Sequence, residues 1–155
     1  MFGLQSLLAW VVSAPFFAAM AGARPIAALD AIGIALVAFG IAFEAVGDAQ
    51  MARFKADPAN RGQVMDGGLW RYTRHPNYFG EVCVWWGFWA MALAGAGWGG
   101  AWSGVSPILM TVLLLKVSGV AMLEKDIGER RPAYRDYIAR TNAFFPGPPR
   151  PKVAG

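Results

Sequence analysis

The chain has 155 residues, of which 56% are hydrophobic and 15% charged, and its mean hydropathy is +0.38. Soluble domains contain about 45–50% apolar and about 25% charged residues, so these values argue against a soluble enzyme, a disordered chain and a nucleic-acid-binding module. The net charge is +4, but the basic residues lie in two blocks beside apolar runs, which is typical of membrane topology. One cysteine, Cys83, and one histidine, His75, exclude an intramolecular disulfide and a metal site built from several such residues.

The first part of the chain contains two candidate membrane-spanning helices, each of which needs about 20 apolar residues. Residues 2–20 carry no charged side chain, and residues 26–46 have Asp30 near one end and Glu44 near the other. Asp30 is expected to cap the start of its helix. Glu44 either marks a functional site, because an ionisable side chain within a span is costly, or reaches the interface or pairs with an arginine.

A longer apolar run follows the polar middle of the chain. Residues 82–115 carry no charged side chain. A single helix of this length would measure about 51 Å, which is too long for one crossing. The glycines at 95–100 and Pro107 predict a turn in the middle of the run. We therefore expect a helical hairpin, with helices over residues 77–94 and 106–127.

Basic residues set the expected orientation of these helices. The 48–77 loop contains five arginine and lysine residues and the tail contains seven, whereas the two opposite loops contain only Arg24. The positive-inside rule places the loop, the tail and both termini in the cytoplasm. We expect an all-α, polytopic membrane helix bundle over residues 1–149, with about four transmembrane helices, followed by a flexible tail at 150–155.

A dense polar and aromatic motif over residues 67–81 leads into the third span. Proline is well tolerated at the first position of a helix, so Pro76 predicts that the span begins there, with His75 as its cap. The backbone amides of Asn77 and Tyr78 are then free at the positive end of the helix dipole. Such a helix end binds anions readily.

Charged side chains of the same motif extend this pattern. Arg71 and Arg74 come just before the helix, and arginine forms bidentate contacts with phosphate or carboxylate. We therefore expect an anion pocket at the cytoplasmic membrane surface, unless the two arginines only contact lipid headgroups and set the topology. Glu81 follows Asn77 at i+4, so the two share a helix face, and Glu81 either belongs to the site or pairs with an arginine.

The polar tail contains the pattern of one further short helix. Pro132 suits a helix start, and Tyr134, Tyr137 and Ile138 share one face at i, i+3 and i+4 spacing. This pattern predicts a short C-terminal interfacial helix that lies flat on the membrane surface. Tyr134 or Tyr137 either stacks on the planar ring of a cofactor or packs against the protein.

Two sequence patterns carry a family resemblance. They are the string GLWRYTRHPNYFGE at residues 68–81 and a downstream set that comprises Glu124, residues 134–137, Thr141 and residues 144–146. With these residues the chain resembles the DUF1295 group of bacterial membrane proteins, which is related to the C-terminal domain of steroid 5-alpha-reductases. The Arg-His-Pro-x-Tyr core is also shared with isoprenylcysteine carboxyl methyltransferases, so it indicates a superfamily and not one reaction.

The resemblance implies a reductase that binds NADPH with its C-terminal helices and cytoplasmic loops, in a bacterial inner membrane. Such an enzyme delivers hydride to an activated C=C bond of a lipid-like substrate. By motif match, Asn77 and Glu81 correspond to positions at the nicotinamide end, and Asp48 and Lys55 to positions at the adenosine phosphates. No catalytic residue is assigned. The full expected cofactor-binding set is Asp48, Lys55, Arg71, Arg74, His75, Asn77, Tyr78, Glu81, Glu124, Tyr134 and Tyr137.

Members of the resembled family usually carry further spans before the segment matched by residues 2–5, and those spans supply substrate-binding and proton-donating residues. The resemblance therefore implies that the cofactor half is present and the substrate half is missing. We expect membrane lipids and a lipophilic small molecule as partners and no nucleic acid. A homo-oligomer or another chain is expected to supply further helices.

Two other functions are compatible with the same residues. A membrane methyltransferase that uses S-adenosylmethionine would need a smaller pocket and less phosphate recognition than a reductase. A non-catalytic membrane subunit would need neither cofactor. The chain contains no Gly-x-Gly-x-x-Gly motif, so any dinucleotide binding is not of the Rossmann type.

Overall fold

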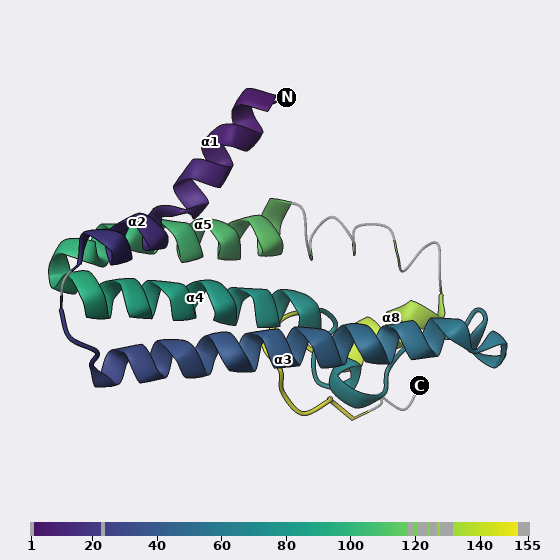
Figure 1. Ribbon diagram of the computed structural model, residues 1–155. Helices are drawn as coiled ribbons and strands as arrows, with labels where there is room; N and C mark the ends of the chain where they lie inside the picture. Colours follow the sequence, from purple (N-terminus) through teal and green to yellow (C-terminus); the bar gives the residue numbers. More distant parts are fainter. Residues whose placement is uncertain are drawn as a thin grey trace. The chain divides into compact units, whose positions relative to one another are not determined.

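A computed structural model describes residues 2–22, 24–117, 120, 124, 127 and 132–151. Within these residues the regular structure is helical and no strand is present, which confirms the expected all-α class (Figure 1). The elements in chain order are α1 (Phe2–Val12), α2 (Ala14–Ala21), α3 (Ala28–Ala56), η1 (Pro58–Asn60), η2 (Gly68–Arg71), α4 (Pro76–Ala96), η3 (Gly97–Gly104), α5 (Val105–Val112), η4 (Leu113–Val117) and α8 (Ala133–Arg140).

Two helical segments are long and apolar enough to cross a membrane. They are Ala28–Ala56, with 29 residues, and Pro76–Val117, with 42 residues. The pair Gly3–Val12 and Ala14–Ala21, which is bent by 43°, adds a third if both helices belong to one span. By length and composition these segments indicate an integral membrane protein. The sequence predicts four spans, whereas the length and hydropathy of the described helices support two, or three if the bent pair is counted as one span.

The expected helical hairpin is present. Figure 1 shows α5 turning back along α4, with η3 as the connection. Gly97, at the start of η3, has a φ of +62°, a left-handed conformation that glycine adopts without strain. Trp86 Nε1 donates a hydrogen bond to Thr111 Oγ1 at 3.4 Å and so joins the two helices. Beyond Val117, most of the helix expected over residues 106–127 lies outside the described residues.

The polar middle of the chain differs from the prediction. Residues 48–56 belong to α3 and are not a loop, because this stretch contains good helix formers and no proline before Pro58. Arg53 and Lys55 lie in the last turn, where a positive charge is favourable at the negative end of the helix dipole. At the other end of α3, Asp30 accepts a hydrogen bond from the Ala27 amide at 2.8 Å, as expected of a cap.

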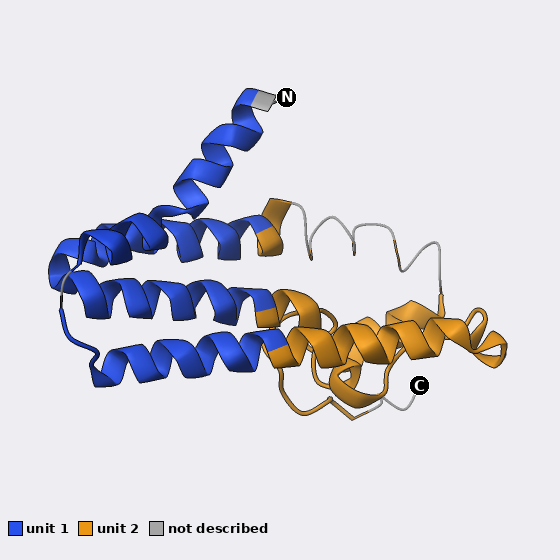
Figure 2. Ribbon diagram, viewed as in Figure 1, with its two compact units in different colours: residues 1–41, 81–113 blue, residues 42–80, 114–155 orange. Residues whose placement is uncertain are grey.

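The chain divides into two compact units (Figure 2). The first unit consists of residues 1–41 and 81–113, and the second of residues 42–80 and 114–155. Both α3 and α4 contribute residues to each unit. The apolar helices meet in the first unit, and the loops and the C-terminal segment form most of the second.

Side chains in the first unit have the distribution expected of helices in lipid. Helices in a membrane associate through small residues, because lipid is as apolar as a large aliphatic side chain. The buried hydrophobic positions here are Val82 and five alanines, namely Ala14, Ala18, Ala90, Ala92 and Ala94. The exposed large ones include Leu4, Leu7, Trp10, Met20, Ile32, Ile34, Phe39, Ile41, Trp98, Trp102 and Ile108.

A close backbone contact in the first unit joins α3 to α4. A Cβ atom placed on Gly87 would lie 2.7 Å from the Gly33 carbonyl oxygen. A Cβ atom placed on Gly33 would lie 2.8 Å from the Gly87 carbonyl oxygen. Both distances are too short for any real Cβ atom, so the approach of the two helices requires glycine at both positions.

The second unit contains the predicted short helix and an extended C-terminal segment. The helix α8 follows Pro132, as expected, and the chain after it is extended. In the tail expected to be flexible, from residue 150, the Arg150 amide donates to the Arg140 carbonyl oxygen at 2.8 Å. Residues 152–155 lie outside the described part of the chain.

Candidate functional site

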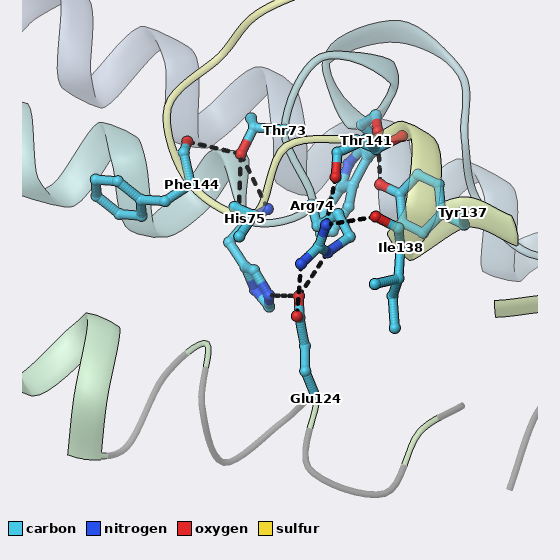
Figure 3. A network of polar contacts seen from close by, with 10 residues as sticks. Thr73, Arg74, His75, Glu124, Tyr137, Ile138, Thr141 and Phe144 are labelled. Carbon is cyan, nitrogen blue, oxygen red and sulfur yellow. Dashed lines mark hydrogen bonds and ion pairs between the residues drawn. The ribbon is translucent and has the colours of Figure 1, made fainter. Parts of the chain in front are cut away.

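In the second unit, hydrogen bonds tie the loop before α4 to the C-terminal segment. The Tyr137 hydroxyl donates to the Trp70 carbonyl oxygen at 2.5 Å, and the Thr73 hydroxyl donates to the Phe144 carbonyl oxygen at 2.8 Å (Figure 3). Tyr137 and Thr73 are almost fully buried. The two motifs that are separate in the sequence therefore form one structural element.

Arg74 is the centre of a buried ion-pair cluster (Figure 3). Its Nε donates to Glu124 Oε1 at 2.7 Å and its Nη2 donates to Glu124 Oε2 at 2.6 Å, a bidentate pair. Its Nη1 donates to the carbonyl oxygens of Ile138, at 3.1 Å, and Thr141. The side chain thus joins the start of α4, the end of α8 and Glu124.

His75 completes this cluster. Its Nε2 lies 2.9 Å from Glu124 Oε1, and its ring stacks on Tyr78 at a centroid distance of 5.3 Å and an interplanar angle of 3°. The helix begins at Pro76, as predicted, and the His75 carbonyl oxygen accepts a hydrogen bond from the Phe79 amide at 3.1 Å. His75 therefore precedes α4 at the N-cap position and accepts the first hydrogen bond of the helix with its backbone, whereas its side chain contacts Glu124.

The charges of the cluster compensate one another. Burial by itself raises the pKa of Glu124, but the hydrogen bonds from His75 and Arg74 and the charge of Arg74 outweigh it and lower the pKa to about 2. The carboxylate is therefore ionised at neutral pH and balances the Arg74 guanidinium. This balance makes the cluster a structural support for the loop rather than a source of free positive charge.

Arg71 and Arg74, which are expected to form one anion pocket, line different spaces in the structure. Arg74 is 6% exposed, and its donors are directed to Glu124 and to backbone carbonyl groups. A buried guanidinium requires such partners, because an unpaired buried charge is very costly. Arg71 is exposed at the end of η2 and lines a different cleft, with Arg140 and Arg150.

A cavity of about 180 Å³ lies beside the ion-pair cluster, at the start of α4. Its walls are Trp70, Arg74, His75, Asn77, Tyr78, Glu124, Ile127 and Tyr134. Six of the expected cofactor-binding residues are therefore brought together around one space. The volume of this cavity alone is smaller than that of sites for drug-sized ligands, which usually enclose about 300–1,000 Å³.

A second cavity of about 470 Å³ shares three wall residues with the first, namely Trp70, Ile127 and Tyr134. Its remaining walls come from the end of α3 and the loop that follows. They include the cations Lys55 and Arg61 and the carboxylate Asp57. The two cavities therefore adjoin each other, with two cations and one carboxylate in the walls of the larger one and the ion-pair cluster beside the smaller one.

The other expected site residues line neither of these cavities. Asp48 is exposed on α3, Arg71 lies in the separate cleft, and Glu81 is half-buried on α4. Tyr137 is 1% exposed, and burial raises the pKa of its phenol. Because almost none of its surface is exposed, the Tyr137 ring packs against the protein, which is the second of the two expected alternatives.

The structure also adds wall residues that the sequence patterns do not single out. Trp70 contributes to both cavities and donates its Nε1–H to the Gly47 carbonyl oxygen at 2.9 Å. A tryptophan in an otherwise polar loop is a signal that could have identified it. Arg61 and Ile127 carry no such signal, because only the folded chain brings them to the cavity.

The fold and the site define an all-helical protein that carries apolar helices of membrane-spanning length and a polar cluster with two adjoining cavities. The family model described as "Protein of unknown function (DUF1295)" matches residues 1–141, so the chain belongs to the DUF1295 family. This match confirms the family predicted from the two motifs. No curated protein and no solved structure matches the chain.

Proposed function

We propose that the protein is an integral membrane oxidoreductase of the steroid 5-alpha-reductase type. It binds NADPH and reduces an activated C=C bond of a lipid-like substrate. The observation that supports this proposal best is the pair of adjoining cavities in the second unit, which share Trp70, Ile127 and Tyr134.

The residues around the two cavities suit a dinucleotide. A dinucleotide is long and carries its negative charge on phosphates, and Lys55 and Arg61 line the larger cavity. The smaller cavity contains Asn77 and Tyr78, at the N-terminal end of α4, where the helix dipole is positive. Nucleotide phosphates in the larger cavity and a ring in the smaller one would use both spaces.

Each group of side chains has a separate role in this proposal. Bound NADPH supplies the hydride, while the protein supplies binding and orientation. Lys55 and Arg61 compensate the phosphate charge. The Asn77 side chain offers an amide to a polar ring substituent, and the Arg74–Glu124 pair holds the wall of the smaller cavity in place.

The proposal includes an arrangement in the membrane. Four crossings would place both termini and the basic region after α3 on the cytoplasmic side of a bacterial inner membrane, in agreement with the positive-inside rule. A cytoplasmic cofactor would then reach the cavities from water, and a lipophilic substrate would arrive from the bilayer. A second copy of the chain or another protein would supply further helices.

Binding of NADPH by the detergent-solubilised full chain is the expected result of isothermal titration. Replacing Lys55 with glutamine is expected to weaken this binding about tenfold, because a hydrogen bond to a charged group is worth about 1.5–3 kcal/mol. Replacing Asn77 with alanine is expected to remove measurable binding while the thermal unfolding midpoint stays close to that of the parent protein.

Arg53→Gln is the matched control, because Arg53 is an exposed cation on the same helix and lines neither cavity. It should bind NADPH like the parent protein. Binding of S-adenosylmethionine in place of NADPH would contradict the reductase and favour a methyltransferase. Binding of neither molecule would favour a non-catalytic membrane subunit.

A further inference from the structure

We infer that a third space in the second unit, an arginine-lined cleft, binds a phosphate group. The cleft encloses about 590 Å³, and its walls include Arg71, Arg140 and Arg150 together with Asp66 and the adjacent Gly67. None of these residues lines either cavity of the proposed cofactor site. The inference therefore adds a site to the proposed reductase function and does not depend on it.

Three separate segments each bring one guanidinium group to the arginine cleft. Arg71 ends η2, Arg140 ends α8, and Arg150 lies in the extended C-terminal segment. The Arg150 amide donates to the Arg140 carbonyl oxygen at 2.8 Å, and the Gly147 amide donates to the Tyr72 carbonyl oxygen at 3.1 Å. These backbone hydrogen bonds hold the three segments together. The three arginines therefore lie close to one another because of the tertiary structure.

The arginine cleft has an excess of positive charge. Asp66 forms an ion pair with Arg140, which leaves Arg71 and Arg150 as exposed cations of the cleft. In addition, Arg140 Nε is buried and has no hydrogen-bond partner among the residues that the structure describes. This atom is closed to solvent, so the donors that face an added anion are those of the exposed Arg71 and Arg150.

The chemistry of the arginine cleft favours phosphate among anions. Guanidinium groups bind phosphate through two parallel hydrogen bonds, and two uncompensated positive charges match a phosphate dianion better than a single carboxylate. The backbone beside the arginines is also accessible, because a Cβ atom placed on Gly67 would meet no atom within 4 Å. The cleft can therefore surround a phosphate group with several donors.

Phosphate groups can reach this site from two sources. One is a soluble phosphate or phosphate ester, and the other is the headgroup of an anionic phospholipid. Basic segments of membrane proteins are attracted to anionic lipid surfaces, and the second unit contains most of the basic residues of the chain. Both sources present the same chemistry to the arginine cleft, and they can be separated by experiment.

The test uses the detergent-solubilised full chain in two arms. The first arm titrates inorganic phosphate by calorimetry, and the second follows retention of phosphatidylglycerol or phosphatidylcholine by native mass spectrometry. The double variant Arg71→Gln/Arg150→Gln is expected to lose about tenfold in phosphate affinity or to lose its bound phosphatidylglycerol. Asp66→Asn removes the carboxylate that the described residues contribute to the cleft and is expected to bind several-fold more tightly.

Arg53→Gln, an exposed cation outside the cleft, controls for the general loss of positive charge. Phosphate binding alone identifies a soluble ligand, and selective retention of phosphatidylglycerol identifies a lipid headgroup. Binding of neither probe, or an equal loss in Arg53→Gln, overturns the inference.

The two proposals fail separately. The double arginine variant should keep the NADPH affinity of the parent protein, and Lys55→Gln should keep the phosphate affinity, because no residue is shared between the sites. A loss of NADPH binding in the double arginine variant would show that the cleft belongs to the cofactor site and would overturn its separate assignment.

Discussion

Replacing Glu124 with alanine is expected to destabilise the protein by about 3–5 kcal/mol, the usual cost of breaking a buried ion pair on one side. The variant leaves the Arg74 guanidinium buried with half of its hydrogen-bond acceptors and without its counter-charge. It also removes the partner of His75 Nε2. The measurement is the thermal unfolding midpoint in detergent, which should fall by on the order of 10 °C.

Asp136→Ala is the matched control for this prediction. Asp136 is an exposed carboxylate in the first turn of α8, where its removal should cost about 1 kcal/mol or less. The double variant Arg74→Met/Glu124→Leu should recover part of the loss, because apolar residues can replace a buried ion pair without a large cost. A cost for Glu124→Ala no greater than that for Asp136→Ala would show that the cluster does not stabilise the fold.

The same cluster makes the stability depend on acid pH. The pKa of Glu124 falls from an ordinary value of 4.5 to about 2 in the folded protein. The group therefore stabilises the fold fully above pH 4.5, and this contribution, about 3 kcal/mol, is lost as the pH falls from 4.5 towards 2. Glu124→Gln should unfold with a weaker pH dependence than the parent protein across this range.

Replacing Gly87 with leucine is expected to be the next most damaging change, at about 3 kcal/mol. The new Cβ atom would lie 2.7 Å from the Gly33 carbonyl oxygen, which belongs to the backbone of α3 and cannot turn aside as a side chain could. The helices would have to separate and would lose their close contact. A lowered unfolding midpoint and a broadened gel-filtration peak in detergent would report this loss.

Gly3→Leu is the corresponding control, because Gly3 is also a helical glycine but a Cβ atom there would meet no atom within 4 Å. It should leave the unfolding midpoint unchanged or raise it slightly, since glycine is a poor helix former. An equal loss in Gly3→Leu and Gly87→Leu would mean that the contact of α3 with α4 does not stabilise the protein.

These two contacts support different parts of the molecule. The glycine contact packs the apolar helices of the first unit, and the Glu124 cluster holds the loop and the C-terminal segment of the second. The cavities of the proposed cofactor site use the walls that this cluster stabilises. Glu124→Ala should therefore weaken NADPH binding as well as stability, whereas Gly87→Leu acts first on stability.

Local signals in the sequence were sufficient for much of the fold. Hydropathy predicted the apolar helices, Pro76 and Pro132 predicted helix starts, and the glycines at 95–100 predicted the hairpin turn. Such signals depend on residues close together in the chain, so they can be recognised without the tertiary structure. The same locality explains the error at residues 48–56, because a polar stretch resembles a loop unless its good helix formers are weighed.

The site depended on contacts that no local pattern contains. The sequence placed Arg74 next to a helix start and so predicted that it binds an anion, but its charge is compensated by Glu124, 50 residues away. Arg71 likewise shares a cleft with Arg140 and Arg150, which the sequence does not indicate because these residues lie far from Arg71 in the chain. The sequence alone determined the family motifs, the helices and the excess of basic residues. The tertiary structure decided which cations are paired and which remain exposed, because burial and counter-charges exist only in the folded chain.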